Sequence, residues 1–291
     1  MSEKQDRLIG SSPAFLRVVH AARMVAATDA TVLVIGERGS GKELLAREIH
    51  ATSRRRNSPF RVVNCAGTSA DQFSAELHGL SDAGTLLLDE VGELSLENQA
   101  ELIHGLDSLQ GNIRLIASSS SDLHDLMSRG TFREDLYYRL YVVPLEIPSL
   151  RERSDDIIPL LKQFSQAMAR THNRRAPRYS VTSRSILKSY PWPGNVRELR
   201  NFCQRMVILM AGRIVQPEDL PAEVRCSAAG KGSARVPFML PPEGIDLLAL
   251  EGDMIRQALG MTGGNRSKAA RLLGISRDTL LYRIQKHAIE A

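Results

Sequence analysis

Apolar residues in the first half of the chain fall into short continuous runs, separated by stretches with helical spacing. Four runs of aliphatic and β-branched side chains have the length of buried strands: 32–35, 60–64, 84–89 and 113–118. Between them, apolar residues recur every three or four positions, the period of an amphipathic helix. Because strands that alternate with helices pair in parallel and are covered on both faces, the pattern predicts an α/β domain with a parallel sheet.

Helical spacing dominates the rest of the chain. Helices are predicted over 155–169 and 181–212, where PWPGN interrupts the second, and they are expected to form a small lid. The segment from 223 to about 240 is rich in Ser, Ala, Gly, Lys and Pro, which is typical of a flexible linker. The predicted division of the chain is an α/β subdomain at 1–150, a helical lid at 151–222, a linker at 223–245 and an all-α domain at 246–291.

Composition narrows the class of protein. The chain has 291 residues, 43% of them apolar, but no apolar run near the roughly 18 residues that a membrane span needs. Its first seven residues are polar and mixed in charge, so they predict neither a secretory signal nor a transit peptide. The three cysteines are far apart and lack metal-ligand spacing, which suits a reducing cytosol. A cytoplasmic protein without a membrane partner is expected.

The sequence GERGSGKE follows the first predicted strand and opens a helix. Glycines in such a turn let backbone N–H groups close around anionic oxygens, and the helix N-terminus adds partial positive charge. The spacing matches a phosphate-binding loop (P-loop), although Glu43 replaces the usual Ser or Thr after the lysine. The alternative is a glycine-rich turn that binds nothing. The residues expected at the ligand are Gly36, Glu37, Arg38, Gly39, Ser40, Gly41, Lys42 and Glu43.

Two carboxylates, Asp89 and Glu90, end the strand-forming run TLLLDE. Ligands bind at the carboxyl ends of strands in open α/β sheets. Asp89 is placed to hold Mg²⁺ directly or through water, since Mg²⁺ prefers oxygen ligands and keeps several waters, and Glu90 to orient an attacking water. Phosphoryl transfer needs mainly positioning and charge neutralisation, so this pair and Lys42 form a sufficient core. The alternative is an ordinary strand end with solvated acids.

Five segments together resemble a known family, the AAA+ domain of bacterial sigma-54-dependent transcription activators. They are GERGSGKE at Gly36–Glu43, AGTLLLDEVGEL at Ala83–Leu94, FREDLYYRL at Phe132–Leu140, PSLRER at Pro148–Arg153 and WPGNVREL at Trp192–Leu199. The resemblance covers about residues 8–221 in the same order, and Glu after the loop lysine is the rule in that family. It implies an AAA+ P-loop fold with a helical lid that binds ATP and Mg²⁺.

The resemblance also implies catalytic roles by position. Asp89 would hold the magnesium site, and Glu90 would polarise the hydrolytic water with Asn64 as its switch partner. Arg133 and Arg139 resemble arginine fingers that act on the nucleotide of the neighbouring subunit. Such fingers predict a homo-oligomer, from a dimer to a hexameric ring, or a related hetero-oligomer.

Further positions correspond to nucleotide contacts in the family. Arg197 resembles the lid arginine that senses the γ-phosphate, and Ile9 and Gly10 resemble the segment that lines the adenine pocket. Arg38 stands where the family usually carries Thr. Ser119 and Ser120 replace the Thr and Asn expected at the first sensor site. The Ser120 hydroxyl can still bind water or phosphate but lacks the donors of an amide, so slow hydrolysis is expected.

A long loop of the family has no counterpart in this sequence. Relatives carry a GAFTGA motif there, which contacts sigma-54, whereas only four residues separate Gly79 from Gly84. Fully extended, these span about 14 Å, too little for a projecting hairpin. The sigma-54 contact is therefore expected to be missing. The chain also begins almost directly at the nucleotide domain, so no amino-terminal regulatory domain is expected.

The last 46 or so residues are predicted to fold as three short helices. One lies in LLALEGDMIRQAL, Asn265 caps the second, and Ser276 caps the third after a turn at Gly274. KAARLLGISRDTLLYRI resembles the helix-turn-helix of a Fis-type domain. From Asn265 to His287 six bases face one acid, a net +5 that equals that of the whole chain. The expected DNA contacts are Arg266, Ser267 and Lys268 at phosphates, and Arg277, Asp278, Thr279, Tyr282 and Arg283 near base edges.

Two hypotheses for the whole chain follow. In the first, a ring-forming ATPase binds DNA and remodels a transcription complex that includes RNA polymerase holoenzyme. In the second, a DNA-binding regulator, acting as a repressor or with the housekeeping sigma factor, uses ATP only as an assembly ligand. A third interpretation is a nucleotide-dependent helper outside transcription, and a small basic oligomerisation module is the alternative for the C-terminal helices. Lys42, Glu90, Arg133 and Arg139 favour hydrolysis, whereas the short loop and the altered sensor favour the second hypothesis.

Overall fold

The computed structural model describes residues 8–69, 72–75, 84–108, 113–225, 246–287 and 289. The chain divides into two compact units, Met1–Lys231 and Gly232–Ala291. The segment between Gly79 and Gly84, where the family's long loop is missing from the sequence, lies outside the described residues. The predicted linker falls mostly outside them as well, but residues 222–225 are helical and Val224 is buried against the lid.

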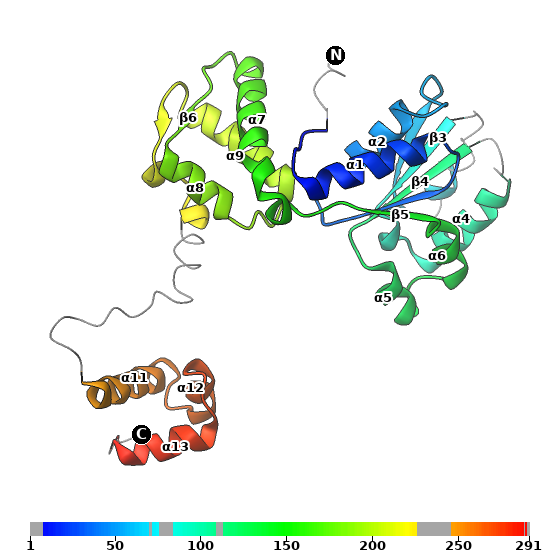
Figure 1. The fold of residues 1–291 in the computed structure, drawn as a ribbon. Coiled ribbons are helices and arrows are strands. Elements are labelled where there is room, and N and C mark those ends of the chain that lie inside the picture. The colour runs from blue at the N-terminus through cyan, green and yellow to red at the C-terminus, as the bar shows by residue number, and fades with distance from the viewer. Residues whose placement is uncertain are drawn as a thin grey trace. The chain divides into compact units, whose positions relative to one another are not determined.

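The first unit is built on a five-stranded parallel sheet, as the sequence pattern predicts (Figure 1). Its strands are β1 (Val32–Ile35), β2 (Phe60–Asn64), β3 (Gly84–Asp89), β4 (Ile113–Ser119) and β5 (Val143–Glu146), in the order β2-β3-β4-β1-β5. The sequence pattern does not predict β5. This strand is short and contains Pro144, a residue that lacks an N–H donor and is tolerated on an edge strand such as this one.

Helices cover both faces of this sheet (Figure 1). On one face α1 (Pro13–Ala26) and α2 (Lys42–Ala51) pack on Val32, Val34 and Leu87. On the other, α4 (Leu96–Ser108), α5 (Leu123–Ser128) and α6 (Glu134–Leu140) enclose Leu33, Leu86 and Leu88. Successive strand residues therefore enter opposite cores, because side chains alternate across a strand. The inner strands β1 and β3 are almost wholly apolar because both of their faces are buried.

The lid forms its own core within the same unit. It comprises the 3₁₀ segments η2 (Leu150–Asp156) and η3 (Pro217–Asp219), α7 (Ile157–Thr171), α8 (Val181–Ser189), α9 (Asn195–Leu209) and the short strands β6 (Arg178–Tyr179) and β7 (Ile214–Val215). The PWPGN break falls between α8 and α9, as predicted. Trp192 in this break is fully buried, meets the Tyr190 and Phe202 rings edge-on, and donates its indole N–H to the Leu187 carbonyl at 2.9 Å.

The second unit is the predicted set of three helices, α11 (Leu247–Met261), α12 (Arg266–Leu272) and α13 (Arg277–Lys286). Both predicted caps are present: the Asn265 side chain accepts from the Lys268 N–H, and the Ser276 hydroxyl accepts from the Thr279 N–H. Gly274 adopts φ +68° in the turn between α12 and α13. Over the described residues, no helix of either unit combines the length and apolar character that crossing a bilayer requires.

A buried histidine links α2 to the sheet and makes stability depend on pH. His50 lies under Phe60, and its Nδ1 is 2.9 Å from the Thr85 hydroxyl. Burial lowers the pKa of His50, and the nearby Arg114 and Arg47 charges lower it further. Because the unfolded chain then binds a proton more readily than the folded one, the free energy of unfolding should fall as the pH drops below about 6.5.

We expect His50→Gln to lose this part of the pH dependence. Urea unfolding of the wild type and the variant between pH 7.5 and 5.5 would measure it, and the variant should show the shallower decline. His172→Gln, which changes an exposed histidine, is the matched control and should keep the wild-type slope. Equal slopes for His50→Gln and the wild type would show that His50 does not titrate differently on folding.

Candidate functional site

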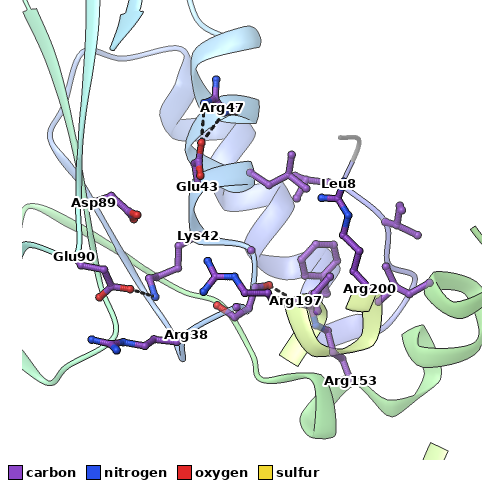
Figure 2. Close-up of a pocket in the computed structure, with 18 of the residues that line it drawn as sticks. Leu8, Arg38, Lys42, Glu43, Arg47, Asp89, Glu90, Arg153, Arg197 and Arg200 are labelled. Atoms are coloured by element: carbon purple, nitrogen blue, oxygen red, sulfur yellow. Dashed lines mark hydrogen bonds and ion pairs between the residues drawn. The ribbon is translucent and has the colours of Figure 1, made fainter. Parts of the chain in front are cut away.

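A pocket of about 460 Å³ lies at the carboxyl ends of β1 and β3, between the sheet and the lid (Figure 2). This is the edge of an open parallel sheet at which ligands bind. Six basic side chains line it but only three acidic ones, so the pocket favours a polyanion. The basic residues are Arg38, Lys42, Arg47, Arg153, Arg197 and Arg200, and the acidic ones are Glu43, Asp89 and Glu90.

The glycine loop between β1 and α2 has the backbone geometry that the sequence predicts. Gly39 and Gly41 adopt φ values of +77° and +109°, which favour glycine. A Cβ at Gly39 would also lie 2.4 Å from the Gly194 carbonyl oxygen, so the lid excludes a side chain there. Gly41 caps α2 without a side chain, and the first N–H groups of this helix are left for an anion.

Lys42 is buried at the start of α2 with its ammonium group in the pocket (Figure 2). Its Nζ donates to the Gly36 carbonyl at 2.8 Å and forms an ion pair with Glu90 Oε1 at 2.9 Å. The carbonyl holds the lysine under the loop, and the carboxylate neutralises it. An incoming phosphate would have to compete with Glu90 for this charge.

Glu90 is fixed by β4 as well as by Lys42. Its Oε2 accepts from both the backbone N–H and the hydroxyl of Ser120, at 2.8 and 2.7 Å. Its own N–H donates to the Ser118 hydroxyl at 3.1 Å and stabilises a left-handed φ of 61°. Burial alone raises the pKa of Glu90, but the hydrogen bonds from Lys42 and Ser120 outweigh it and leave that pKa below its usual value. The carboxylate is therefore ionised at neutral pH.

Asp89 and Asn64 lie side by side at the ends of β3 and β2, where the parallel register pairs them. Both line the pocket. The Asp89 carboxylate accepts a hydrogen bond from Ser118, whereas the Asn64 amide oxygen accepts from the Ala66 N–H at 3.0 Å. Ser118 was missed by the sequence analysis. The register could have found it, since Leu88 pairs with Ala117 and the next residues are Asp89 and Ser118.

The lid holds the loop from behind. Asn195, fully buried at the start of α9, donates through Nδ2 to Glu37 Oε2 at 3.0 Å and to the Arg38 carbonyl at 3.2 Å. The Val196 N–H donates to the Gly39 carbonyl at 3.0 Å. Arg151 adds a two-pronged ion pair to Glu37, and its hydrogen bond, followed by that of Asn195, lowers the pKa of Glu37. The loop carbonyls are thus satisfied by the lid.

Apolar side chains close the other end of the pocket. Leu8, Ile9, Phe15, Leu160 and Phe164 line it there, from the segment before α1, from α1 itself and from α7. The segment before α1 is held in place by the buried Asp156 carboxylate, which accepts from the Ser11 N–H at 2.6 Å and the Ser12 N–H at 2.9 Å. An apolar end beside a cationic end suits a flat base attached to phosphates.

Arg153 connects the two ends of the pocket, a role that the sequence pattern does not predict. Only 2% of Arg153 is exposed; its Nη2 donates to the Ser40 carbonyl at 2.7 Å, and its guanidinium lies 4.3 Å from the Phe15 ring centroid. Burial lowers the pKa of Arg153 to about 10, so it stays charged at neutral pH. PSLRER contained the residue, but its packing against Phe15 depends on tertiary contacts.

Four predicted ligand contacts do not line the pocket. Glu37 faces the lid, Gly36 lies below the loop near Ile147, and Ser120 is bonded to Glu90. Gly10 serves packing instead, because a Cβ there would meet the Phe15 ring at 2.3 Å. The other predicted positions do line it, namely Ile9, Arg38, Gly39, Ser40, Gly41, Lys42, Glu43, Asn64, Asp89, Glu90 and Arg197.

The two arginines expected to act as fingers do not reach the pocket of their own chain. Arg133 occupies the N-cap position of α6, and its side chain pairs with Asp135 at 2.8 Å. Arg139, at the other end of the same helix, donates to the Ile103 carbonyl at 3.2 Å. Both therefore lie on the α6 side of the sheet, on the face opposite α1 and α2 (Figure 1).

In the second unit, the predicted DNA contacts differ in how free they are. Arg277, Asp278 and Tyr282 on α13 are exposed, as are Arg266, Ser267 and Lys268 at the start of α12. Thr279 is partly buried, its hydroxyl 2.7 Å from that of Ser276. Arg283 is paired with Glu251 of α11 at 2.6 Å, and the same carboxylate lies 2.9 Å from His287 Nε2. This role of Glu251 is not predicted by the sequence pattern.

Three consecutive parts of the chain match known protein families. Residues 9–150 match the sigma-54 interaction domain, residues 151–236 the AAA+ ATPase lid domain, and residues 247–287 the Fis family of bacterial regulatory proteins. The order is the one that the sequence resemblance implies.

Known proteins resemble the chain over nearly its full length. The transcriptional regulatory protein ZraR of Klebsiella oxytoca is 36% identical over 97% of the chain and 69% of its own length. The regulatory protein AtoC of Escherichia coli is also 36% identical, over 97% of the chain and 68% of its own length. The alignment with ZraR spans 315 positions, more than the 291 residues of this chain, so ZraR carries residues without a counterpart here.

Solved structures also resemble the chain over nearly its full length. The crystal structure of NtrX from Brucella abortus in complex with ATP has a TM-score of 0.71 and 30% identity, covering 99% of this chain and 70% of NtrX. The ADP complex of the same protein has a TM-score of 0.72 and 28% identity, covering 98% of this chain and 70% of NtrX. On these grounds the chain belongs to the sigma-54 activator family of bacterial transcriptional regulators, with an AAA+ P-loop fold and a Fis-type helix-turn-helix unit.

Proposed function

We propose that this regulator binds ATP with Mg²⁺ in the pocket, hydrolyses it as an oligomer, and uses its C-terminal unit to bind DNA. The observation that carries the proposal is the ion pair between Lys42, at the start of α2, and Glu90, at the end of β3. It supports the proposal because an ammonium suited to phosphate and an ionised carboxylate suited to accept a proton lie 2.9 Å apart beside an open helix N-terminus.

The shape of the pocket supports ATP as the ligand. The loop N–H groups and Lys42 suit the phosphates, and the apolar end around Ile9 and Phe15 suits the base. Arg197 and Arg200 project from α9 toward the pocket, and their side chains form no hydrogen bond or ion pair with other described residues (Figure 2). They are available to the phosphates. NtrX, which is similar to 99% of this chain, has been crystallised with ATP.

Asp89 is the residue that fits Mg²⁺ best. Over the described ranges, no cluster of three or more His, Cys, Asp or Glu side chains could hold a metal ion alone. Mg²⁺ in such a site takes one or two carboxylates and completes its shell with phosphate oxygens and water, a set that Asp89 and the ligand provide. When bound, the ion neutralises phosphate charge.

The chemistry assigned to the protein is to orient water and stabilise charge. When a phosphate takes the Lys42 ammonium, Glu90 loses its ion-pair partner but keeps both hydrogen bonds from Ser120. Its carboxylate then stays in place as the acceptor for the proton of an attacking water. Ser120, expected at the ligand, acts here by holding Glu90.

Oligomerisation would complete the site. Arg133 and Arg139 lie outside their own pocket, and an arginine donated by a neighbour stabilises transition-state charge by factors of about 10³ to 10⁵ in rate. A site whose fingers come from the next subunit turns over only when assembled. This supports a homo-oligomer, from a dimer to a ring, or a hetero-oligomer with a relative.

The second candidate function is a regulator for which ATP is an assembly ligand and sigma-54 is not contacted. Two features of the sequence favour this second function. Only four residues separate Gly79 from Gly84, and Ser119 and Ser120 stand at the sensor position. A chain whose sequence leaves out the family's long loop has less to move by hydrolysis. The two candidate functions differ in whether ATP is turned over and in which sigma factor the partner RNA polymerase holoenzyme carries. They also differ in whether transcription is activated or repressed.

Replacing Glu90 separates the two functions. We expect Glu90→Gln to lower steady-state ATP turnover by about 100-fold or more, because the base is lost, while ATP binding persists because the loop and Lys42 remain. Glu97→Gln, an exposed acid on α4, is the control and should turn over ATP like the wild type. The same background rate in the wild type and Glu90→Gln would remove the hydrolysis proposal and leave the assembly-ligand function.

Mixing variants tests whether the fingers act between subunits. Arg133→Ala should lose turnover although its own pocket is intact, and Glu90→Gln should lose it although its finger is intact. A mixture of the two should regain turnover, because Glu90→Gln subunits donate Arg133 to competent pockets. Phosphate release would be followed against the mixing ratio. A mixture no faster than either variant alone would contradict action between subunits.

The exposed α13 side chains should carry sequence-specific DNA binding. Arg277→Ala should cost about 1 to 3 kcal/mol on a site selected from random duplexes, and leave ATP affinity unchanged. Arg256→Ala is the matched control, since this exposed arginine of α11 pairs with Asp253, and it should bind DNA like the wild type. Fluorescence anisotropy at fixed salt would measure both. A loss of ATP affinity with Arg277→Ala would argue against a local DNA contact.

A further inference from the structure

Two cations of the phosphate loop are each neutralised by an acid from one four-residue segment. Lys42 pairs with Glu90 at 2.9 Å, and Arg38 pairs with Glu93 at 2.6 Å. Glu93 ends the 3₁₀ turn η1 (Val91–Glu93) that follows Glu90 directly, and its N–H donates to the Glu90 carbonyl at 3.0 Å. The loop and the end of β3 are thus joined by two ion pairs.

The backbone of Arg38 is held by the lid, whereas its side chain is mostly exposed. Its carbonyl accepts from the buried Asn195 amide, and the next carbonyl, that of Gly39, accepts from the Val196 N–H. The Arg38 side chain, by contrast, is 65% exposed and runs along the pocket beside Lys42 and Glu90 (Figure 2). Arg38 lines the pocket, whereas Glu93 does not.

The two possible partners of Arg38 differ in strength. An ion pair as exposed as that with Glu93 contributes little, because water screens it and two long side chains must be ordered. A phosphate carries more charge than a carboxylate and accepts a guanidinium in a two-pronged geometry. A phosphate within reach would therefore displace Glu93. Arg38 lies on the Glu90 side of the pocket (Figure 2). In the proposed function, the last phosphate of a triphosphate and the attacking water lie on this side.

We propose that Arg38 reads the terminal phosphate of a bound nucleoside triphosphate from within its own subunit, by exchanging Glu93 for that phosphate. This rests on the proposed nucleotide site and deepens it. With a diphosphate, Arg38 stays paired with Glu93 and ties η1 to the loop. With a triphosphate, Glu93 is released, and η1 is held to the loop by neither ion pair, since Lys42 has left Glu90 for the phosphate.

The test is the ratio of affinities for a non-hydrolysable ATP analogue and for ADP, measured on the full chain by isothermal titration calorimetry with Mg²⁺. Arg38→Ala should weaken binding of the analogue by about tenfold, which is the effect of losing a charged hydrogen bond to one phosphate. It should change ADP binding by less than about twofold. Arg38→Lys should keep part of the preference. Glu93→Gln removes the competing acid and should tighten analogue binding alone, several-fold.

A matched variant and a double variant complete the design. Arg129→Ala removes an exposed arginine outside the pocket that is likewise paired with an acid, Asp125 at 2.7 Å, and should leave the ratio unchanged. In Arg38→Ala/Glu93→Gln, the effect of Glu93→Gln should vanish. Equal losses for the analogue and ADP in Arg38→Ala, or a Glu93→Gln effect that persists without Arg38, would overturn the inference. Wild-type protein that binds neither nucleotide would instead overturn the proposed function.

Discussion

The structure depends on the contact between the phosphate loop and the lid, above all the PWPGN turn between α8 and α9. A loop that offers its N–H groups to an anion must satisfy its carbonyl groups elsewhere, because buried backbone oxygens without partners are costly. Here the lid satisfies them: Asn195 bonds the Arg38 carbonyl, the Val196 N–H bonds the Gly39 carbonyl, and Arg153 bonds the Ser40 carbonyl. The lid is therefore part of the loop's structure, and any motion of one must change the hydrogen bonds of the other.

This contact is kept at the expense of backbone strain in the turn. Trp192 and Asn195 have φ values of 49° and 51°, a region that costs a residue with a side chain about 1 to 3 kcal/mol. Burial of the Trp192 ring and the hydrogen bonds of Asn195, including one from the Leu150 N–H at 2.7 Å, offset the cost. Strain held by so many contacts marks the turn as the point where lid and loop are coupled.

The sequence predicts the parts of the site that are local and leaves out those made by packing. Spacing alone identifies the glycine loop, Lys42 and the carboxylates after β3, because strand, turn and helix are contiguous there. It could not show that Glu37 turns to the lid, since this depends on Arg151 and Asn195, more than 110 residues away. Arg153 and Ser118 escaped for the same reason. Four strands and the three C-terminal helices were predicted, whereas Pro144 concealed β5.

In the C-terminal unit, packing determines which of the basic side chains are paired with an acid and which are exposed. Six bases crowd into residues 265–287, so their mutual repulsion must be offset before three short helices can pack. Glu251 does this from α11, with His287 on one carboxylate oxygen and Arg283 on the other. The hydrogen bond with His287, followed by the charge of Arg283, lowers the pKa of Glu251. Arg283 thus joins α13 to α11, whereas Arg277 on the same helix and Arg266 and Lys268 at the start of α12 are exposed.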